Sequence, residues 1–533
     1  MRLLKHKSDY VIVGAGSAGS VLANRLSLDH SVTVIEAGPA DYPWDFRLHM
    51  PAALSHVLSN DTYNWFYQSE REPYLNNRNM YCPRGRVLGG SSSINGMVYV
   101  RGHPQDFDNW ATLPGLENWS FEHCLPYFKR AEDCAHGDEE IRGRGGPLHI
   151  GRSKANNPLV NAWLSAGVEA GYDQTPDMNG WQQEGMSVFE STIKNGRRFS
   201  TAQAYLHPIK RRTNLAIRKK SLATRILFDQ EKAIGLEFRH GGRLHTIEAN
   251  KEVILCGGAI NSPQLLMLSG IGNADDLTQL HIPVVSDLPG VGQNLQDHME
   301  VYIQYSCLKP VSIYPALRWF NQPAIGIEWY LFSKGLGATN HFEAGAFLKS
   351  SSAVQYPDLQ FHFLPVAMNY DGKQMHKGHG FQLHVGPMKP KSRGTITLRS
   401  NDPSEHPRIL FNYNSAAEDR EVMRKGVRLA RGIIAQLSFD EYRGIELRPG
   451  AQKASDDELD SFIRQHGESA YHPSCTCKMG EDSLAVVDGD ARVHGIDSLR
   501  VVDASIMPEI TNGNLNAPVI MMAEKLSDVI LGH

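Results

Sequence analysis

The sequence predicts an α/β protein (α+β overall) of two domains: a discontinuous domain on a parallel sheet, and a second domain with an antiparallel sheet flanked by helices. Three observations predict this arrangement. A βαβ pattern opens the chain, aromatic and β-branched runs occupy residues 300–469, and strand and helix patterns return near the C-terminus. A chain of 533 residues is also too long for one small core.

The composition is that of an ordinary folded protein, with 41% hydrophobic and 21% charged residues. A formal net charge of −4 without a Lys/Arg-rich block provides no electrostatic surface for nucleic acid. No run reaches the roughly 20 apolar residues of a membrane-spanning helix, and seven scattered cysteines suit a reducing compartment. We therefore expect a cytoplasmic protein without a nucleic-acid partner or a transmembrane segment. Attachment to the inner face of the cell membrane and homo-oligomer formation stay open.

The first element is a βαβ unit with a glycine turn. DYVIVGAGSAGSVLANRL predicts a buried strand, a turn and a helix, and SVTVIEAG predicts a second strand. In a G-x-G-x-x-G turn, the first glycine permits the tight turn, the second lets backbone approach a pyrophosphate, and the third packs helix on strand. The helix N–H groups then face the phosphates, and an acidic residue about 20 positions on accepts ribose hydroxyls. The predicted Rossmann-like dinucleotide site comprises Gly14, Gly16, Ser17, Ala18, Gly19 and Glu36.

A second strand and turn follow in the middle of the chain. KEVILCGGAINSPQLLML predicts a strand that ends at Cys256, a Gly257-Gly258 turn, and a helix that begins near Ser262 and Pro263. This block would join the same sheet as the first strand.

The C-terminal segment repeats the pattern. SLRVVDASIMP predicts a strand and a turn, and APVIMMAEKLSDVIL predicts a helix with Pro518 in its first turn. Before it, FEAGAFL, LQFHFLP and RGTITLRS indicate an antiparallel sheet. We expect the first domain at residues 1–155, 197–299 and 470–533, and a substrate-binding domain at residues 156–196 and 300–469.

Four motifs carry a resemblance to a known family. RGRVLGGSSSING, GGAINSPQLLMLSGIG, YHPSCTCKMG and VVDASIMPEITNGNLNAPVIMMAEK, in this order, resemble the glucose-methanol-choline (GMC) family of FAD oxidoreductases over nearly the whole chain. Segments such as MPAAL, SNDTYNWFY and NHFEAGAFL resemble the family members that oxidise choline. The resemblance implies FAD as the cofactor and choline as the alcohol, oxidised to betaine aldehyde and onward to glycine betaine. A respiratory or other electron acceptor would then reoxidise the flavin.

The resemblance also implies the flavin contacts. The matching positions are Arg86, Leu88, Gly89, Gly90, Asn95, Asp503, Ala504 and Asn516. A helix N-terminus near Asn516, aimed at the flavin, would stabilise the anion formed on reduction. Choline oxidases of the family attach FAD through a histidine where this chain has Ile94. We therefore expect non-covalent FAD, and a dehydrogenase rather than an oxidase.

Oxidation of an alcohol requires a base for the hydroxyl proton and an acceptor for the hydride. Histidine changes charge near neutral pH and suits the base. His472 matches the family's proton-handling histidine, and Asn514 matches its partner, whose amide can bind the substrate oxygen. Glu300 matches the carboxylate that meets a trimethylammonium group, and His362 and Tyr471 match neighbouring substrate-pocket residues.

Each of these residues has an ordinary structural alternative: a hydrogen-bonded core residue, a turn residue or a surface carboxylate. A zinc site at His472, Cys475 and Cys477 is disfavoured because no second cysteine pair accompanies the C-x-C step, so we expect no metal. The aromatic residues of a cation cage are left open among Trp65, Tyr302 and Trp319.

Three other functions remain as alternatives. The first keeps the flavin chemistry but acts on an uncharged primary alcohol. The second is a non-redox lyase with a structural flavin, because the family's fold also includes such enzymes. The third is a protein without a cofactor.

Overall fold

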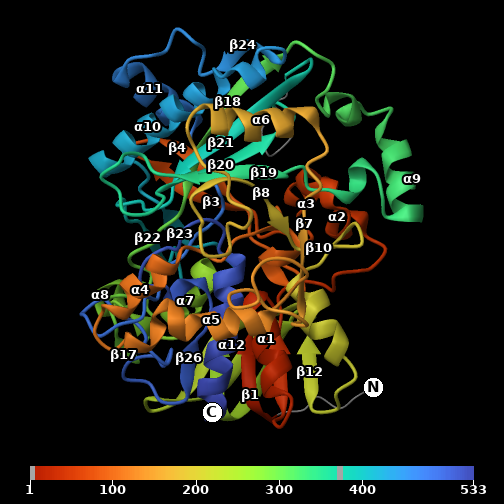
Figure 1. Ribbon diagram of the computed structural model, residues 1–533. Helices are drawn as coiled ribbons and strands as arrows, with labels where there is room; N and C mark the ends of the chain where they lie inside the picture. The colour runs from red at the N-terminus through yellow and green to blue at the C-terminus, as the bar shows by residue number, and fades with distance from the viewer. Residues whose placement is uncertain (1–6, 369–375, 533) are drawn as a thin grey trace.

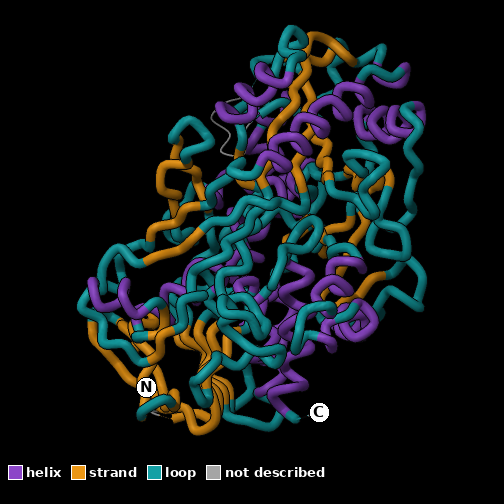
Figure 2. The backbone as a smooth tube through the Cα atoms, turned by 90° about the vertical axis from the view of Figure 1, so that its left-hand side faces the viewer, coloured by secondary structure: helices purple, strands orange, loops and turns teal. Residues whose placement is uncertain are grey.

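The computed structural model describes residues 7–368 and 376–532, so parts of both predicted domains, residues 1–6, 369–375 and 533, lie outside it. Figure 1 shows strands from the two ends of the chain together in the lower part of the molecule, and a second group of strands above them. Figure 2, a view turned by 90°, shows the strands nearest the N-terminus at the same lower end. Within the described residues, no helix combines the length and apolarity needed to cross a bilayer.

The lower sheet has seven strands in the order β12-β2-β1-β15-β14-β13, with β26 beside β15. The strands are β1 (Lys7–Val13), β2 (Val32–Ile35), β12 (Leu215–Arg218), β13 (Ser221–Asp229), β14 (Lys232–His240), β15 (Arg243–Leu255) and β26 (Leu499–Val501). The strand β1 runs parallel to both β2 and β15, with Val11 opposite Thr33 and Val253. The predicted discontinuous α/β architecture is therefore confirmed, because one sheet takes strands from the start, the middle and the end of the chain.

Three helices pack together beside this sheet: α1 (Ser17–Leu26), α5 (Phe121–Ala131) and α12 (Asn516–Leu531). The carboxylate of Glu524 in α12 is fully buried and joins them. Its Oε1 lies 2.7 Å from Arg25 Nη2 of α1, and its Oε2 lies 2.8 Å from Arg130 Nε of α5. The Tyr205 hydroxyl also donates to this carboxylate, at 2.9 Å. Pro518 occupies the first turn of α12, as predicted.

The helix α7 (Gly258–Leu268) begins four residues earlier than predicted, so Pro263 lies inside it rather than in its first turn. A proline within a helix leaves the carbonyl four residues before it without a donor. That carbonyl belongs to Ala259, and it accepts a hydrogen bond from the Thr476 hydroxyl at 2.7 Å. The distant chain segment therefore compensates for the proline.

The upper sheet is antiparallel, in the order β24-β18-β21-β20-β19-β8, with β25 beside β18. The strands are β8 (Gly185–Val188), β18 (Met299–Cys307), β19 (Ala344–Leu348), β20 (Leu359–Leu364), β21 (Gly380–Pro387), β24 (Arg443–Arg448) and β25 (Glu468–Ser469). The helices α6 (Pro158–Glu169) and α10 (Ala417–Ile434) pack on it, and α11 (Asp456–His466) packs on α10. The segment RGTITLRS differs from the prediction: β22 (Thr395–Thr397) pairs only with β23 (Arg408–Leu410) in a separate ribbon.

A smaller sheet, in the order β5-β9-β7-β6, connects the two halves. It contains β5 (Val98–Tyr99), β6 (Glu132–Cys134), β7 (Leu148–Arg152) and β9 (Glu190–Ser191). These strands come from both sides of the predicted boundary between residues 155 and 156. The domain limits given above remain proposals.

The helix α9 (Gln322–Phe332) lies at the outside of the molecule, at the right of Figure 1. Apolar residues lie on all sides of this helix, yet Trp329 is its only buried side chain. Tyr330 and Phe332 are each 65% exposed, and Trp319, just before the helix, is 81% exposed. Most of an apolar helix is thus left facing solvent.

Candidate active site

A cavity of about 300 Å³ extends from the glycine turn after β1 to the segment around His472. Most of the predicted site residues line it: Gly14, Gly16, Ser17, Ala18, Glu36, Gly90, Asn95, Glu300, His362, Tyr471, His472, Asp503, Ala504, Asn514 and Asn516. Four predicted cofactor contacts are not part of this lining: Gly19, Arg86, Leu88 and Gly89. The fold therefore brings together residues as far apart in the sequence as Gly14 and Asn516.

The glycine turn has backbone that other residues could not adopt. Gly14 has a φ of +99°, and a Cβ there would lie 2.5 Å from the Cys256 carbonyl oxygen. A Cβ at Gly19 would lie 1.9 Å from the Gly14 carbonyl oxygen, so this glycine lets α1 pack on β1. Gly16 differs, because a Cβ there would meet nothing closer than 4.0 Å. Gly16 thus leaves open space at the cavity wall.

Glu36 lies directly after β2 and is 6% exposed. One carboxyl oxygen accepts the Ala15 N–H at 2.9 Å, and the other accepts the Gly38 N–H at 2.7 Å. Burial raises the pKa of Glu36 to about 7, and these two N–H groups oppose the shift. The carboxyl is held against the glycine turn and faces the cavity.

A second glycine segment touches the first. Gly90 has a φ of +53°, and a Cβ on it would lie 2.7 Å from the Gly16 Cα. Asn95 accepts a bond from Arg198 Nη1 at 2.8 Å, which fixes the end of the segment. Ile94, between them, is 2% exposed and lines the cavity. Its alkyl side chain has no group that could bond covalently to a cofactor.

The C-terminal segment closes the same wall. Asp503 accepts the Ser262 hydroxyl at 2.6 Å and the Gly258 N–H at 2.8 Å, which joins the turn after β26 to the start of α7. Asn516, the first residue of α12, accepts the Ser17 hydroxyl at 2.6 Å. The N-termini of α1 and α12 therefore meet at the cavity, and their unpaired N–H groups favour a negatively charged ligand.

His472 belongs to a chain of hydrogen bonds that assigns its tautomer. His298 Nε2 lies 3.2 Å from the Met388 carbonyl oxygen, which can only accept, so Nε2 of His298 carries the proton. His298 Nδ1 is then the acceptor for His472 Nδ1–H, at 3.0 Å. This leaves His472 Nε2 unprotonated, and it accepts the Asn514 amide N–H at 3.1 Å. A neutral imidazole with its free nitrogen toward Asn514 is suited to accept a proton.

The surroundings keep both histidines neutral. Burial holds the pKa of His472 well below its ordinary value of 6.5, and the nearby cation of Arg84 acts in the same direction. Burial also lowers the pKa of His298 to about 3. Asp297 fixes their backbones, because it accepts the His472 N–H at 2.6 Å and the His298 N–H at 2.9 Å.

Glu300 is a buried carboxylate in the same cavity, 3% exposed. It lies on β18, and its Oε1 is 3.0 Å from His384 Nδ1 on the neighbouring strand β21. His362, on β20, lines the cavity opposite His384 in the register, and burial lowers its pKa to about 4. Tyr471 also lines the cavity, beside His472, with a φ of +66°. This part of the cavity therefore has a carboxylate and neutral rings.

Comparison with known proteins identifies the chain. Two family profiles described as GMC oxidoreductase match residues 8–300 and 390–523. The chain belongs to the GMC oxidoreductase family. Relatives named oxygen-dependent choline dehydrogenase are 55% identical over 531 residues in Pseudomonas savastanoi pv. phaseolicola, and 56% identical over 530 residues in Yersinia pestis. Each alignment covers 98% of this GMC oxidoreductase and 94% of the relative.

Solved structures agree with this membership. Pyridoxine 4-oxidase from Mesorbium loti is 32% identical with a TM-score of 0.90, over 98% of this chain and 99% of that one. An FAD-dependent oxidoreductase from Chaetomium thermophilum is 27% identical with a TM-score of 0.88, and the comparison covers 98% of this chain and 99% of that one. This GMC oxidoreductase is thus an FAD-dependent enzyme, as the sequence predicted. The open backbone at Gly16 and the two helix N-termini fit the pyrophosphate of such a cofactor.

Two residues of this site in the GMC oxidoreductase, His298 and Asp297, were not predicted from the sequence. A signal was present: His298 lies two positions before Glu300, and residues two apart lie on one side of an extended chain. Phe342, which lines the cavity, was not predicted either. Of the suggested cage residues, Trp65 lines the cavity, whereas Tyr302 is 4% exposed and stacks on His384 with ring centres 4.1 Å apart. Trp319 is at the surface.

The geometry of this GMC oxidoreductase does not support the alternative zinc site at His472, Cys475 and Cys477. Within residues 7–368 and 376–532, the ligand atoms of His472, Cys475 and Cys477 do not converge on one point. Cys475 instead bonds the Ser474 hydroxyl at 3.3 Å, and both cysteines are buried. His472 uses its two nitrogens for His298 and Asn514.

Proposed function

We propose that the protein oxidises choline to betaine aldehyde and onward to glycine betaine, with non-covalent FAD. The observation that carries the proposal is the buried Glu300 carboxylate in the same cavity as the neutral His472. The full-length relatives named as choline dehydrogenases support the same substrate. Electrons then pass to a respiratory or other acceptor, and the name of these relatives favours oxygen as one such acceptor.

His472 and Asn514 activate the alcohol. The hydroxyl of the substrate displaces the Asn514 amide from His472 Nε2, which takes the hydroxyl proton, while Asn514 Nδ2 turns to the substrate oxygen. Before the substrate binds, Gln360 Nε2, 3.4 Å from Asn514 Oδ1, orients the amide with Nδ2 toward His472. FAD, held at the glycine turn and the two helix N-termini, would supply the acceptor for the hydride of the alcohol carbon. His298 supports the charge that His472 acquires, because it accepts the Nδ1–H at the far side of the ring.

Glu300 selects a cation. Burying a carboxylate until it is 3% exposed costs free energy, unless a positive charge lies beside it. His384 Nδ1, 3.0 Å from Glu300 Oε1, provides a hydrogen bond, whereas His362 has a lowered pKa and adds no charge at neutral pH. A trimethylammonium group would provide it, and the rings of Phe342 and Tyr471 in the lining add cation–π attraction.

Ile94 supports non-covalent attachment, because an alkyl side chain occupies the position of the attaching histidine. Acid precipitation of the yellow holoenzyme should release all the flavin into the supernatant. Flavin retained in the pellet would contradict non-covalent binding.

Anaerobic flavin reduction tests the substrate. Choline should bleach the flavin, and its neutral isostere 3,3-dimethyl-1-butanol should do so with a KM at least about tenfold higher. Glu300→Gln should raise the KM for choline by about 10- to 100-fold and leave the KM of the isostere nearly unchanged. Equal effects on both alcohols would favour the uncharged-alcohol alternative. A flavin that no alcohol bleaches would favour a lyase.

We also propose that the protein works at the inner face of the cell membrane. The exposed apolar surface of α9 supports this, since aromatic side chains next to cations favour a lipid interface, and Arg318 and Lys334 flank the helix. Sedimentation with vesicles of phosphatidylcholine and phosphatidylglycerol tests it. The double substitution Trp319→Ser and Phe332→Ser should abolish binding, and Leu437→Ser, at a residue outside α9 that is 77% exposed, should not. Equal binding by all three proteins would contradict this role of α9.

A further inference from the structure

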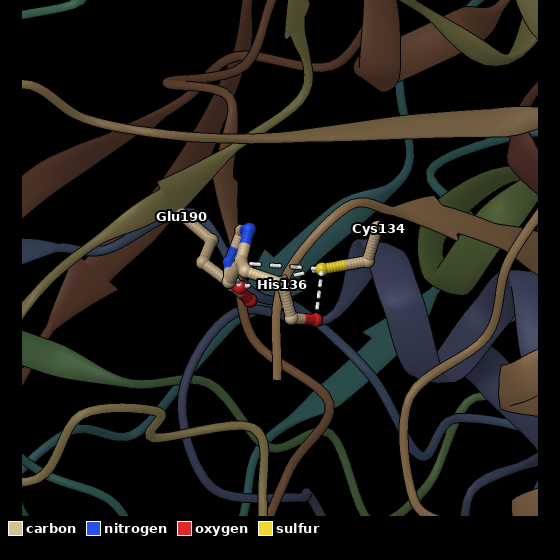
Figure 3. Close-up of side chains that lie close together, drawn as sticks. All are labelled: Cys134, His136 and Glu190. Atoms are coloured by element: carbon tan, nitrogen blue, oxygen red, sulfur yellow. Dashed lines mark hydrogen bonds and ion pairs between the residues drawn. The ribbon is translucent and has the colours of Figure 1, made fainter. Parts of the chain in front are cut away.

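A cluster outside the cavity has chemistry that alcohol oxidation does not use. Cys134 ends β6, His136 lies in the turn after it, and Glu190 lies on β9 (Figure 3). The strand β7 pairs with both β6 and β9 and so fixes their separation. Within the described ranges, this is the group of three such side chains whose potential ligand atoms converge. It is independent of the FAD cavity, because none of the three residues lines that cavity.

The distances suit a tetrahedral metal ion. Cys134 Sγ lies 3.6 Å from His136 Nε2 and 3.7 Å from Glu190 Oε1. Bonds of about 2.3 Å to sulfur and about 2.0–2.1 Å to nitrogen and oxygen place neighbouring ligands of a tetrahedral zinc ion roughly 3.3–3.7 Å apart. Two of the three separations therefore already match. The third pair, Nε2 and Oε1, is hydrogen-bonded and must separate by about 1 Å to admit the ion.

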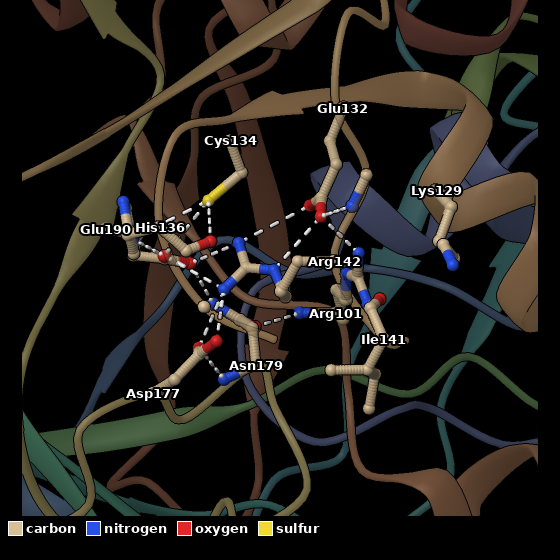
Figure 4. A network of polar contacts seen from close by, with 12 residues as sticks. Arg101, Lys129, Glu132, Cys134, His136, Ile141, Arg142, Asp177, Asn179 and Glu190 are labelled. Carbon is tan, nitrogen blue, oxygen red and sulfur yellow. Dashed lines mark hydrogen bonds and ion pairs between the residues drawn. The ribbon is translucent and has the colours of Figure 1, made fainter. Parts of the chain in front are cut away.

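His136 can make this movement, because its side chain is 27% exposed and lies in a turn. Glu190 is the fixed ligand. Its Oε2 accepts Arg142 Nη2 at 2.9 Å and Asn179 Nδ2 at 2.7 Å (Figure 4). Its Oε1 accepts Arg142 Nη1 at 3.0 Å and also faces Cys134 Sγ. Partners that orient a metal ligand in this way are part of most metal sites.

The buried charged groups beside Glu190 do not sum to zero. The buried network contains three carboxylates, Glu132, Asp177 and Glu190, and two guanidinium groups, Arg101 and Arg142 (Figure 4). One negative charge is therefore left over. A divalent ion bound to a cysteine thiolate and a neutral histidine adds one positive charge. A proton on His136 adds the same charge, so the ion and the proton compete for one place.

We propose that Cys134, His136 and Glu190 bind a zinc ion, with water as the fourth ligand on the exposed side of His136. A thiolate and an imidazole favour zinc over magnesium or calcium. The ion would join the turn after β6 to β9, across the predicted boundary between the two domains. Its role would be structural and separate from alcohol oxidation.

Zinc binding to the chelator-treated holoenzyme tests the site, by equilibrium dialysis and elemental analysis. We expect one zinc ion per chain, and at least about tenfold weaker binding in Cys134→Ser and in His136→Gln. The control Cys307→Ser, at a half-buried cysteine elsewhere, should bind as the parent does. The rate of flavin reduction should be the same in Cys134→Ser as in the parent.

X-ray absorption at the zinc edge gives a second test on the unmodified protein, which does not depend on a variant that folds. One sulfur neighbour at about 2.3 Å is expected. A zinc shell without sulfur, zinc binding unchanged in Cys134→Ser, or no stoichiometric binding at micromolar zinc would overturn the proposal.

Discussion

His472 is held as a neutral base by contacts on both ring nitrogens. General base catalysis by a positioned side chain contributes about 10²- to 10⁴-fold to rate. His472→Gln should therefore slow anaerobic flavin reduction by about this factor, while the protein remains yellow. The matched control His123→Gln, at an exposed histidine, should reduce at the parent rate. A His472→Gln variant with parent activity would remove this residue from the mechanism.

The lowered pKa of His472 predicts the pH profile. A base is active only when unprotonated, and burial holds its pKa well below 6.5. The rate of flavin reduction at low substrate concentration should therefore be level from about pH 7 upward, and should fall only below about pH 6.5. Stopped-flow measurements from pH 5 to 9 provide the test. A decline that starts above pH 7.5 on acidification would show that His472 is not held neutral in this way.

His298 is a positioning residue, since it touches His472 and not the cavity. His298→Leu leaves the His472 Nδ1–H without an acceptor, at a cost of about 1–3 kcal/mol, so reduction should slow by roughly 10- to 100-fold. His298→Gln, which can still accept this bond, should recover part of the rate. The acid limb of the pH profile should move in His298→Leu, which a purely structural role would not cause. Equal rates and profiles in both variants would contradict the assigned tautomer.

At the scale of elements, the β1–α1 turn and Glu36 after β2 predict how cofactor affinity depends on pH. The raised pKa of about 7 means that Glu36 holds a proton below pH 7 and is a carboxylate above it. A carboxylate accepts ribose hydroxyls better than a neutral carboxyl does. FAD should therefore bind the apoprotein more tightly at pH 8 than at pH 6, as measured by quenching of flavin fluorescence. Glu36→Gln should remove this dependence, and the exposed control Glu231→Gln should keep it.

Local patterns predicted some elements well, for physical reasons that can be named. The glycine turn and the strand β1 follow from short-range sterics and apolar periodicity, so the structure agrees with them. The predicted start of α7 was wrong. A helix that continues through Pro263 needs a donor for the Ala259 carbonyl, and that donor is Thr476, more than 200 residues away in the sequence. His298 was missed for a similar reason: its importance comes from His472 and Met388, which only the tertiary fold brings to it.

At the scale of the whole molecule, Glu524 joins three helices through one buried carboxylate. Removing one partner of a buried ion pair costs about 3–5 kcal/mol, because the remaining charges stay buried. Glu524→Ala should therefore lower the free energy of unfolding by about this amount. Asp528→Asn, at a carboxylate 26% exposed, should cost at most about 1 kcal/mol. Thermal unfolding followed by flavin release compares them, and equal midpoints would contradict the role of Glu524.

The discontinuous lower sheet has a consequence for synthesis on the ribosome. The strand β1 is made first, but its neighbour β15 is complete only at residue 255, and β26 and α12 follow after residue 498. At about 5–20 residues per second, roughly 25–100 s pass between the synthesis of β1 and that of β26, the last strand of its sheet. Until the C-terminal segment is made, α1 lacks its partner α12 and β15 lacks its partner β26. The cofactor turn is among the first parts translated and among the last to become functional.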